Sequence, residues 1–426
     1  MFDSDAPAGL RFVNMPEQDE TQQTAVDGDA HDVAVTRYAR PTWAEIDLDA
    51  LAANFHAVRR RVGSEVKVMA VVKADAYGHG AAGCARRLAA EGADWFGVAL
   101  PEEGFELRAA GVTQPILCLE GFWEGQAGAL VKEQLTPVVY RLDMAEAFDA
   151  AARAGGVVAD VHVKIDTGMG RLGVRHEAAA EFARALKKFA HLRVDGLMTH
   201  FASADEAARD AFTEEQAARF QAAREAFQAA GHAPTLVDMA NSAATFAHPS
   251  TRGNMVRPGG VLYGLWRDVL RPEDNLPEFR PVMNVRSRII LLKWIGAGET
   301  LGYGCTFTAT RPTLVATVPI GYHDGYARAL SNRGRVVVRG RFAPVVGRIS
   351  MDLTLLDVTG VPGIEHGDQV TLVGADGELS VPAEDLARIA GTISYEITCG
   401  ISARVPRRFK GERGRGKEIN RGKRKG

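Results

Sequence analysis

The spacing of hydrophobic positions changes once along the chain, near residue 280. From Thr42 to about residue 275, short apolar runs with β-branched residues alternate with alanine-rich stretches of helical periodicity. Such an alternation over this length predicts an eight-stranded β/α barrel of the TIM type. The candidate strands are residues 66–72, 95–99, 115–119, 136–139, 161–165, 194–197 and 236–238, and the candidate helices are residues 49–61, 82–91, 101–110, 144–154, 176–189 and 214–230.

Beyond residue 280 the apolar runs are shorter and are separated by Gly, Pro and Asp turns. This texture predicts a mostly β C-terminal domain over residues 281–408, after a barrel domain over residues 37–280. The strand-like residues 43–48 precede the barrel and are free to pair with the β domain. The candidate strands of that domain are residues 286–292, 314–318, 335–338, 352–357 and 369–373, and its one candidate helix is residues 383–390.

Composition agrees with a two-domain enzyme. A chain of 426 residues exceeds the size of one hydrophobic core. Its hydrophobic content of 46% and charged content of 24% are typical of a soluble globular protein. The net charge of -2 gives no indication of nucleic acid or a membrane surface as a partner, and no apolar run approaches the ~20 residues that span a bilayer.

The first residues and the cysteines bear on location. The chain does not begin with a basic segment followed by an apolar one, so no secretory signal is expected. Its four cysteines (Cys84, Cys118, Cys305 and Cys399) are widely spaced and lack metal-like pairing. Unpaired cysteines favour a reduced compartment. We therefore predict a cytoplasmic protein with no bound metal.

Both ends of the chain differ in composition from the middle. Residues 1–36 hold eight acidic side chains and one basic one, Arg11. Residues 407–426 hold ten Lys or Arg against Glu412 and Glu418. Charged segments with so little periodicity favour disorder, and we predict a disordered acidic extension over residues 1–36 and a disordered basic tail over residues 409–426. A basic tail can bind nucleic acid, but a solvated tail is the simpler interpretation.

The most informative segment surrounds Lys73. A run of apolar residues predicts a buried strand over residues 66–72, and Lys73 closes it. Burial disfavours the ammonium form of a lysine, and a neutral amine is what Schiff-base chemistry needs. From the strand alone, a lysine that extends to a solvated rim is an equally good interpretation.

Other polar residues follow predicted strands in the same way. They are Lys164 and Arg171 in Lys164-Ile-Asp-Thr-Gly-Met-Gly-Arg171, His200, the pair Asn241-Ser242, and Arg257 in Arg257-Pro-Gly259-Gly260. Function gathers at the carboxyl ends of barrel strands, and glycines let backbone N–H groups approach a phosphate. Structural interpretations remain open: a salt bridge for Lys164, a core histidine for His200, and a helix N-cap for Ser242.

The string VVKADAYGHG, which ends at Gly80, closely resembles the cofactor-lysine segment of the alanine racemase family. At least six further motifs match this family in the same order between Pro41 and Pro406. The resemblance implies an enzyme that interconverts L-alanine and D-alanine with pyridoxal phosphate (PLP), supplying D-alanine for peptidoglycan. It implies that Lys73 holds PLP as a Schiff base. The remaining cofactor-binding residues that it implies are Tyr77, His200, Asn241, Ser242, Arg257, Gly259, Gly260 and Tyr395.

The resemblance also implies residues for substrate and catalysis. Arg171 would approach the substrate carboxylate, and Lys164 would be carbamylated to an anion that holds Arg171 in place. Tyr303, in Gly302-Tyr303-Gly304, would be a second acid/base delivered by the partner subunit of a homodimer. From the same partner, Tyr322, Met351 and Asp352 would line the path of the substrate.

Two opposed bases suit racemisation, because a proton must leave one face of the α-carbon and return to the other. Lys73 would serve the D-alanine face and Tyr303 the L-alanine face. Arg257 would face the pyridine nitrogen and, since arginine keeps its proton, would leave that nitrogen unprotonated. This argues against a PLP-dependent decarboxylase of similar architecture, the main alternative. A racemase of broader specificity and a PLP carrier without activity are the others.

Overall fold

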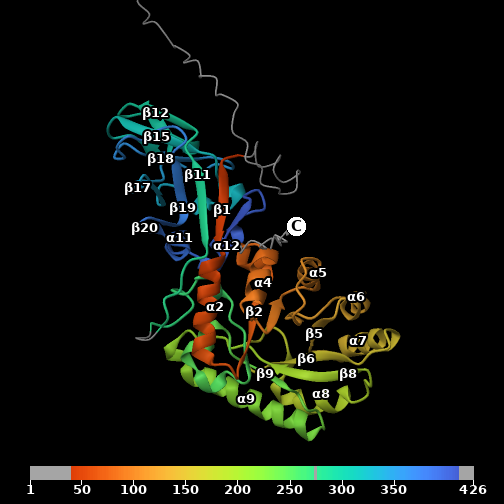
Figure 1. Cartoon of the computed structure of the whole chain (residues 1–426). Coiled ribbons are helices and arrows are strands. Elements are labelled where there is room, and N and C mark those ends of the chain that lie inside the picture. The colour runs from red at the N-terminus through yellow and green to blue at the C-terminus, as the bar shows by residue number, and fades with distance from the viewer. Residues whose placement is uncertain (1–39, 273–275, 412–426) are drawn as a thin grey trace, which may run out of the picture. The chain divides into compact units, whose positions relative to one another are not determined.

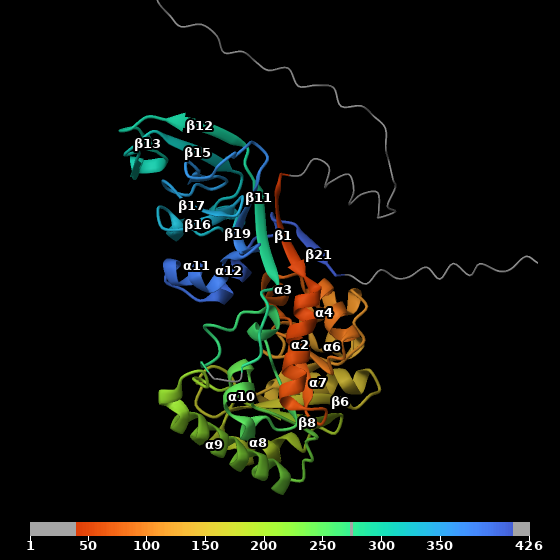
Figure 2. The same cartoon turned by 60° about the vertical axis from the view of Figure 1, so that its left-hand side comes forward.

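The first part of the described chain closes into a parallel barrel (Figures 1 and 2). The structure, a computed structural model, describes residues 40–272 and 276–411. Its eight barrel strands pair in the order β2-β3-β4-β5-β6-β8-β9-β10, and pairings β5–β6 and β10–β2 close the ring. This confirms the predicted fold. The strands are β2 (Lys67–Val71), β3 (Trp95–Val98), β4 (Ile116–Cys118), β5 (Leu135–Val139), β6 (Ala159–Asp166), β8 (Leu192–Met198), β9 (Leu236–Asp238) and β10 (Met255–Val256), with the short β7 (Val174–Arg175) beside β6.

Helices surround the barrel, and their apolar faces explain where they pack. In α7 (Leu142–Ala154), the buried residues Met144, Ala145, Phe148 and Ala152 recur at helical spacing. Helix α2 (Leu48–Val62) begins where the Asp47 carboxylate accepts a hydrogen bond from the N–H of Ala50 at 2.8 Å. The other α-helices of the barrel are α3 (Lys73–Gly78), α4 (Ala81–Ala90), α5 (Pro101–Ala109), α6 (Ala127–Lys132), α8 (Ala179–Leu186), α9 (Asp210–Ala229) and α10 (Ser242–Ala247).

The barrel interior is filled by side chains, so it is no channel. Seven strands contribute one residue each to a separate hydrophobic cluster, and β6 adds His162, whose ring lies 5.4 Å from that of Trp95. Gly196 makes room for this histidine, because a Cβ there would lie 2.5 Å from the imidazole ring. Ligands must therefore bind at an end of the barrel. The seven residues are Met69, Trp95, Leu117, Val138, Met198, Leu236 and Met255.

The second part of the chain is mostly antiparallel β structure. One sheet has the order β17-β16-β19-β11-β1-β21, with β20 beside β19; a second has the order β12-β15-β18, and β13 pairs with β14. The strands are β11 (Met283–Arg288), β12 (Leu291–Ile295), β13 (Thr300–Leu301), β14 (Phe307–Thr308), β15 (Thr313–Val318), β16 (Arg335–Val338), β17 (Arg341–Pro344), β18 (Thr354–Asp357), β19 (Gln369–Asp376), β20 (Leu379–Val381) and β21 (Arg407–Lys410), and the helices are α11 (Ala383–Ala390) and α12 (Ser394–Gly400).

The predicted strand over residues 286–292 is in fact two strands in different sheets. Strand β11 ends at Arg288 and β12 begins at Leu291. The N–H of Ile289 donates to Asp368, whereas the N–H of Ile290 donates to Thr317 in β15. The chain passes between sheets at this point, and a continuous apolar run cannot reveal such a crossing.

The first and last described strands lie side by side in the large sheet. Strand β1 (Thr42–Asp47) pairs antiparallel with β11 and parallel with β21. Phe409, within the predicted basic tail, belongs to β21. Its ring packs against Gly83, where an added Cβ would lie 2.5 Å from the ring. The fold therefore extends through Lys410. The high content of basic residues had placed the start of the disordered tail too early, at residue 409. The predicted extension over residues 1–36 and the rest of the tail, residues 412–426, lie outside the described residues.

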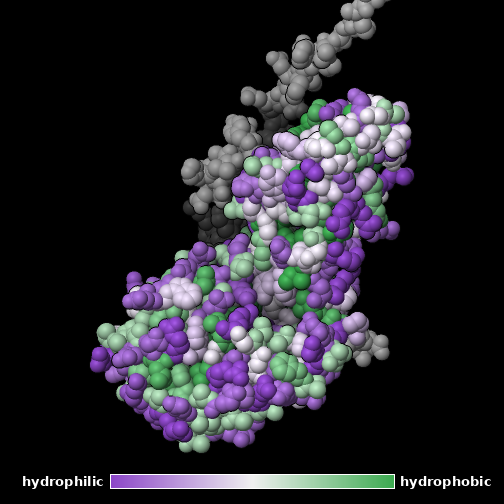
Figure 3. Space-filling model, turned by 180° about the vertical axis from the view of Figure 1, so that it is seen from behind, coloured by the Kyte–Doolittle hydropathy of each residue, from purple (hydrophilic) through white to green (hydrophobic). Residues whose placement is uncertain are grey.

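The molecular surface mixes residue types. On the face seen in Figure 3, hydrophobic residues lie scattered among hydrophilic ones, and some gather where the upper and lower parts of the view meet. Among the helices within residues 40–272 and 276–411, none is both long and apolar enough to cross a membrane.

Candidate active site

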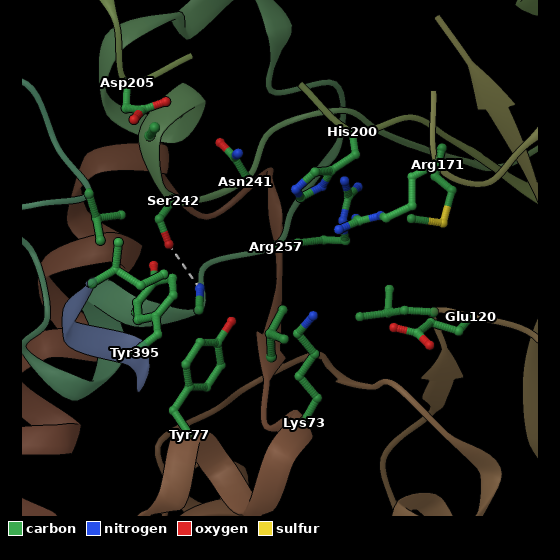
Figure 4. Close-up of a pocket in the computed structure, with 18 of the residues that line it drawn as sticks. Lys73, Tyr77, Glu120, Arg171, His200, Asp205, Asn241, Ser242, Arg257 and Tyr395 are labelled. Carbon is green, nitrogen blue, oxygen red and sulfur yellow. Dashed lines mark hydrogen bonds between the residues drawn. The ribbon is translucent and has the colours of Figure 1, made fainter. Parts of the chain in front are cut away.

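A cavity of about 470 Å³ opens where the barrel strands end at their carboxyl side (Figure 4). Its size is within the range of roughly 300–1,000 Å³ that small-molecule sites occupy. Residues from at least five barrel strands and the loops after them contribute, together with Ile393 and Tyr395 of the β part. The residues predicted from sequence that line this cavity are Lys73, Tyr77, Lys164, Arg171, His200, Asn241, Ser242, Arg257, Gly259, Gly260 and Tyr395.

Lys73 directly precedes a left-handed helical turn that ends at Tyr77. Residues Ala74, Asp75, Ala76 and Tyr77 have φ between 52° and 55°, within helix α3. The left-handed conformation costs roughly 1–2 kcal/mol for each residue with a Cβ, and single residues rather than runs usually adopt it. Lys73 is only partly buried, because it follows the end of β2 and its amine extends into the cavity (Figure 4). The turn thus stores strain next to the site, as functional segments often do.

Three contacts hold this turn in place. The Glu103 carboxylate on α5 accepts a hydrogen bond from the N–H of Ala74 at 2.6 Å. The Arg407 guanidinium, at the start of β21, donates twice to the carbonyl of Gly78, at 2.9 and 3.0 Å. Gly78 itself cannot carry a side chain, since a Cβ would lie 2.2 Å from the carbonyl oxygen of Thr398. The strained turn is therefore stabilised by both the barrel and the β part.

At one end of the cavity, hydroxyl groups converge on the Gly259–Gly260 backbone. The Ser242 hydroxyl accepts a hydrogen bond from the N–H of Gly259 at 2.9 Å (Figure 4). A Cβ at Gly259 would lie 2.3 Å from the Tyr77 hydroxyl, and one at Gly260 would lie 2.3 Å from the Tyr395 hydroxyl. We call these five residues the hydroxyl cradle. Burial raises the pKa of both tyrosines well above its ordinary value, so each keeps a proton to donate to an anion.

Asn241 is the residue that caps helix α10. Its side-chain oxygen accepts a hydrogen bond from the N–H of Ala244 at 3.0 Å. The structure thereby settles the alternative left open for Ser242, which is the first residue of the helix and not its N-cap. Its hydroxyl consequently remains directed to the cradle instead of to its own helix.

The opposite side of the cavity is basic. Burial, followed by the charges of Arg257 and Arg171, lowers the pKa of Lys164 to about 8. Burial and the charges of Arg257 and Lys164 also hold the pKa of His200 well below its ordinary value, so its imidazole is neutral near pH 7. Glu120 faces the same region and partly offsets the positive charge around Lys164.

Arg257 is anchored by a buried carboxylate. It forms an ion pair with Asp238 at the end of β9, and its guanidinium donates to the carbonyl of Thr199 at 2.6 Å. Burial lowers the pKa of Arg257 to about 9, which leaves it protonated at neutral pH, and the adjacent carboxylate favours the same state. Because both partners are almost inaccessible to solvent, the pair fixes the guanidinium in one place in the cavity wall.

Four predicted residues do not lie in the cavity of the same chain. Tyr303, Tyr322, Met351 and Asp352 all belong to the β part, are exposed, and are absent from the cavity wall. Tyr303 is 73% exposed, in a 3₁₀ turn followed by the left-handed residues Gly304 and Cys305. Asp352 forms an ion pair with Arg404 at 2.9 Å.

Sequence reasoning missed several acids near the site. Glu120, Asp205 and Asp268 line the cavity, and Asp238 anchors Arg257. Glu120 directly follows a predicted strand, and Asp238 ends one, so their positions gave a usable signal. Asp205 and Asp268 lie in loops, where the spacing of hydrophobic residues gives no indication of position, and only the fold brings them to the cavity.

Comparison with known proteins agrees with this geometry over nearly all of the described chain. The family model for the alanine racemase N-terminal domain matches residues 46–266, and that for the C-terminal domain matches residues 282–409. An alanine racemase of Geobacter sulfurreducens is 48% identical over 372 residues, which cover 87% of this chain and 97% of that protein. The chain belongs to the alanine racemase family.

Further relatives agree with this assignment. An alanine racemase of Halothermothrix orenii is 44% identical over 381 residues, 89% of this chain and 99% of that protein. A solved alanine racemase of Clostridium difficile 630 superposes with a TM-score of 0.82 at 37% identity, covering 88% of this chain and 96% of that one. As a member of this PLP-dependent family, the protein is an isomerase that interconverts L-alanine and D-alanine.

Proposed function

We propose that Lys73 holds the PLP of this alanine racemase and that the hydroxyl cradle binds the cofactor's phosphate. The residues of the cavity fit this group: an amine, a cluster of protonated hydroxyls around a glycine backbone, and a fixed guanidinium line one cavity of suitable size. The observation that carries the proposal is the close approach of the Tyr77 and Tyr395 hydroxyls to Gly259 and Gly260, which leaves no room for side chains there. When bound, PLP acidifies the α-proton of an amino acid.

Gly260→Ala tests the cradle. The added methyl group would stand 2.3 Å from the Tyr395 hydroxyl, so either the tyrosine or the backbone at residue 260 must shift and the cradle is distorted. We expect the dissociation constant for PLP, measured by equilibrium dialysis, to rise by about tenfold or more, because a lost hydrogen bond to a charged group is worth roughly 1.5–3 kcal/mol. Gly128→Ala is the matched control, since a Cβ there meets nothing within 4 Å. Equal PLP affinity in the two variants would contradict the assignment.

The basic side of the cavity would orient the ring and the substrate. Arg257 keeps its proton and is held by Asp238, so it would face the pyridine nitrogen as a donor without transferring the proton. The neutral His200 would lie against the ring, as the low pKa permits. Arg171 lines the same cavity, and its charge contributes to the lowered pKa of His200; it would bind the substrate carboxylate through its planar fork. A pyridine nitrogen left unprotonated by Arg257 would make the cofactor a weaker electron sink, which would favour quick return of the α-proton and so suit racemisation over side reactions.

Two residues would move the proton. Lys73 would remove or return it on the D-alanine face, and Tyr303 of a second copy would do so on the L-alanine face. The exposure of Tyr303, Tyr322 and Met351 outside the cavity supports a homodimer with shared sites, because within a single chain only one of the two bases lines the cavity. Tyr322, Met351 and Asp352 of that copy would line the path of the substrate.

Lys164 is proposed to be carbamylated, which would convert its ammonium into an anion beside Arg171. A neutral amine attacks carbon dioxide, forming an N–C bond and releasing a proton. Because the pKa of Lys164 is about 8, the reactive neutral fraction grows as the pH rises through that value. With ¹³C-bicarbonate, we expect a carbamate resonance in the NMR spectrum that strengthens from about pH 6 to about pH 9.

Lys164→Arg serves as the control for this resonance. It retains a cation at the position but removes the amine that reacts, so the carbamate signal should disappear from its spectrum. A spectrum of the unmodified sequence that lacks the resonance at saturating bicarbonate would contradict the proposal, as would a resonance that persists in the Lys164→Arg variant.

We also propose a cytoplasmic location and a role in supplying D-alanine for peptidoglycan. All four cysteines are free, as in a reducing compartment. The test of function is racemisation of L-alanine by the purified protein with PLP, followed by chiral chromatography beside serine and lysine. Alanine should react fastest; faster turnover of serine or lysine would indicate a broader racemase. Release of carbon dioxide without racemisation would favour a decarboxylase, which the Arg257–Asp238 pair makes unfavourable.

A further inference from the structure

An acid of the barrel is bonded to the helix that carries Tyr395. Asp268 lies in the loop after the 3₁₀ helix η4 (Gly260–Tyr263) and lines the cavity. Its carboxylate accepts two hydrogen bonds from Ser394, the first residue of α12: one from the backbone N–H at 2.8 Å and one from the hydroxyl at 2.8 Å. Ser394 is completely buried, so both bonds are shielded from water on its side.

These bonds provide what the helix lacks in its own sequence. The residue at the N-cap position of α12 is Ile393, whose side chain makes no capping bond. An anion near the N-terminus of a helix satisfies free N–H groups and interacts favourably with the helix dipole. Asp268 therefore replaces a local cap, and it does so from the other structural part of the chain.

The position of the helix determines where one cradle hydroxyl lies. Tyr395 follows Ser394 directly, and its hydroxyl reaches the Gly260 backbone so closely that a Cβ there would lie 2.3 Å from it. The Asp268 charge also contributes, after burial, to the raised pKa of Tyr395, which keeps this hydroxyl a donor. Both carboxylate oxygens of Asp268 accept a hydrogen bond from Ser394, so the acid is fixed relative to the start of the helix.

We propose that Asp268 is a positioning residue for the phosphate end of the cofactor site, acting by holding Ser394 and thus the Tyr395 hydroxyl in the cradle. The inference rests on the proposed function, because it takes the cradle as the phosphate site. It makes the barrel and the β part jointly responsible for cofactor affinity, through one acid outside the recognised motifs.

The phosphate group itself provides the test. Dissociation constants of PLP and of pyridoxal, which lacks the phosphate, are measured by equilibrium dialysis for the full chain and for Asp268→Ala, Tyr395→Phe and the double variant. We expect Asp268→Ala to weaken PLP binding by about tenfold, to leave pyridoxal binding unchanged, and to add little to the loss in Tyr395→Phe. Glu378→Gln is the control, since Glu378 is an exposed acid of the β part that is absent from the cavity wall, and its loss should leave PLP affinity unchanged.

Each outcome separates the possibilities. If Tyr395→Phe binds PLP like the unchanged protein, the cradle assignment fails and this inference falls with it. If Tyr395→Phe loses affinity but Asp268→Ala does not, only the role of Asp268 is overturned. Equal losses for PLP and pyridoxal, or additive losses in the double variant, would also overturn it. Ser394→Ala, which removes one of the two bonds, is a milder variant should Asp268→Ala fail to fold, and a smaller PLP-specific loss is expected.

Discussion

Lys73→Ala is expected to lower alanine racemisation by at least about a thousandfold. A positioned acid/base group contributes roughly 10²–10⁴-fold to a rate, and this variant loses in addition the amine that would hold the cofactor. The amine extends into the cavity from the residue that directly precedes the left-handed turn, and no side chain on that turn is an amine that could replace it. Racemisation of both enantiomers is followed by chiral chromatography. Borohydride treatment and mass spectrometry then show whether the cofactor is fixed to the protein.

Lys67→Ala is the matched control for this experiment. Lys67 begins the same strand β2, but its side chain is exposed and absent from the cavity wall. Its loss should leave the rate and the borohydride product unchanged. A Lys73→Ala protein that keeps substantial activity, or whose cofactor is still fixed by borohydride, would show that another amine holds PLP, and Lys164 would be the first candidate because its pKa is about 8.

Tyr303→Phe is expected to lower racemisation by about a hundredfold or more, while PLP binding stays intact. The tyrosine is exposed and outside the cavity of its own chain, so its loss should not disturb the hydroxyl cradle. When Tyr303→Phe subunits are mixed with Lys73→Ala subunits, heterodimers carry one intact site. Random exchange should then restore roughly a quarter of the unmodified activity, since half of the dimers have one functional site of two.

The control for this mixture is a second one, of Lys73→Ala subunits with subunits that carry both substitutions. Every site in it lacks Lys73, so no recovery is expected even though subunits exchange equally well. The shared-site proposal fails if the first mixture stays inactive after subunit exchange has been demonstrated, for instance by differently tagged chains. It also fails if a monomeric fraction racemises alanine at the full rate.

The barrel and most of the candidate cavity could be predicted because strand ends are visible in sequence. Lys73, Lys164, His200, Asn241 and Arg257 each follow an apolar run or stand within a few residues of its end, and the fold brings them together. The eighth strand, Met255–Val256, has only two residues and gives no period of its own. It forms because the barrel closes around it, which is a tertiary cause.

Other features could not be predicted, for reasons that are physical. The left-handed turn from Ala74 to Tyr77 contradicts the backbone preference of alanine and tyrosine, and it depends on partners as distant as Arg407. The Asp268–Ser394 bonds join residues 126 positions apart. Phe409 looks like part of a charged tail, but it pairs with Ile46 of β1 and its ring contacts glycines of the barrel. Local patterns carry no information on contacts of this range.

Because β1 pairs with β21, the large sheet can be completed only at the end of synthesis. The ribosome releases Thr42–Asp47 near the start, yet its parallel neighbour Arg407–Lys410 comes roughly 360 residues later, on the order of tens of seconds at typical elongation rates. During that interval the barrel can close, while the first strand has an edge with unsatisfied backbone groups. A nascent chain that stops before residue 407 would therefore keep an exposed strand edge. We expect such truncated chains to aggregate more readily than full-length chains from which a few residues of a surface loop have been deleted.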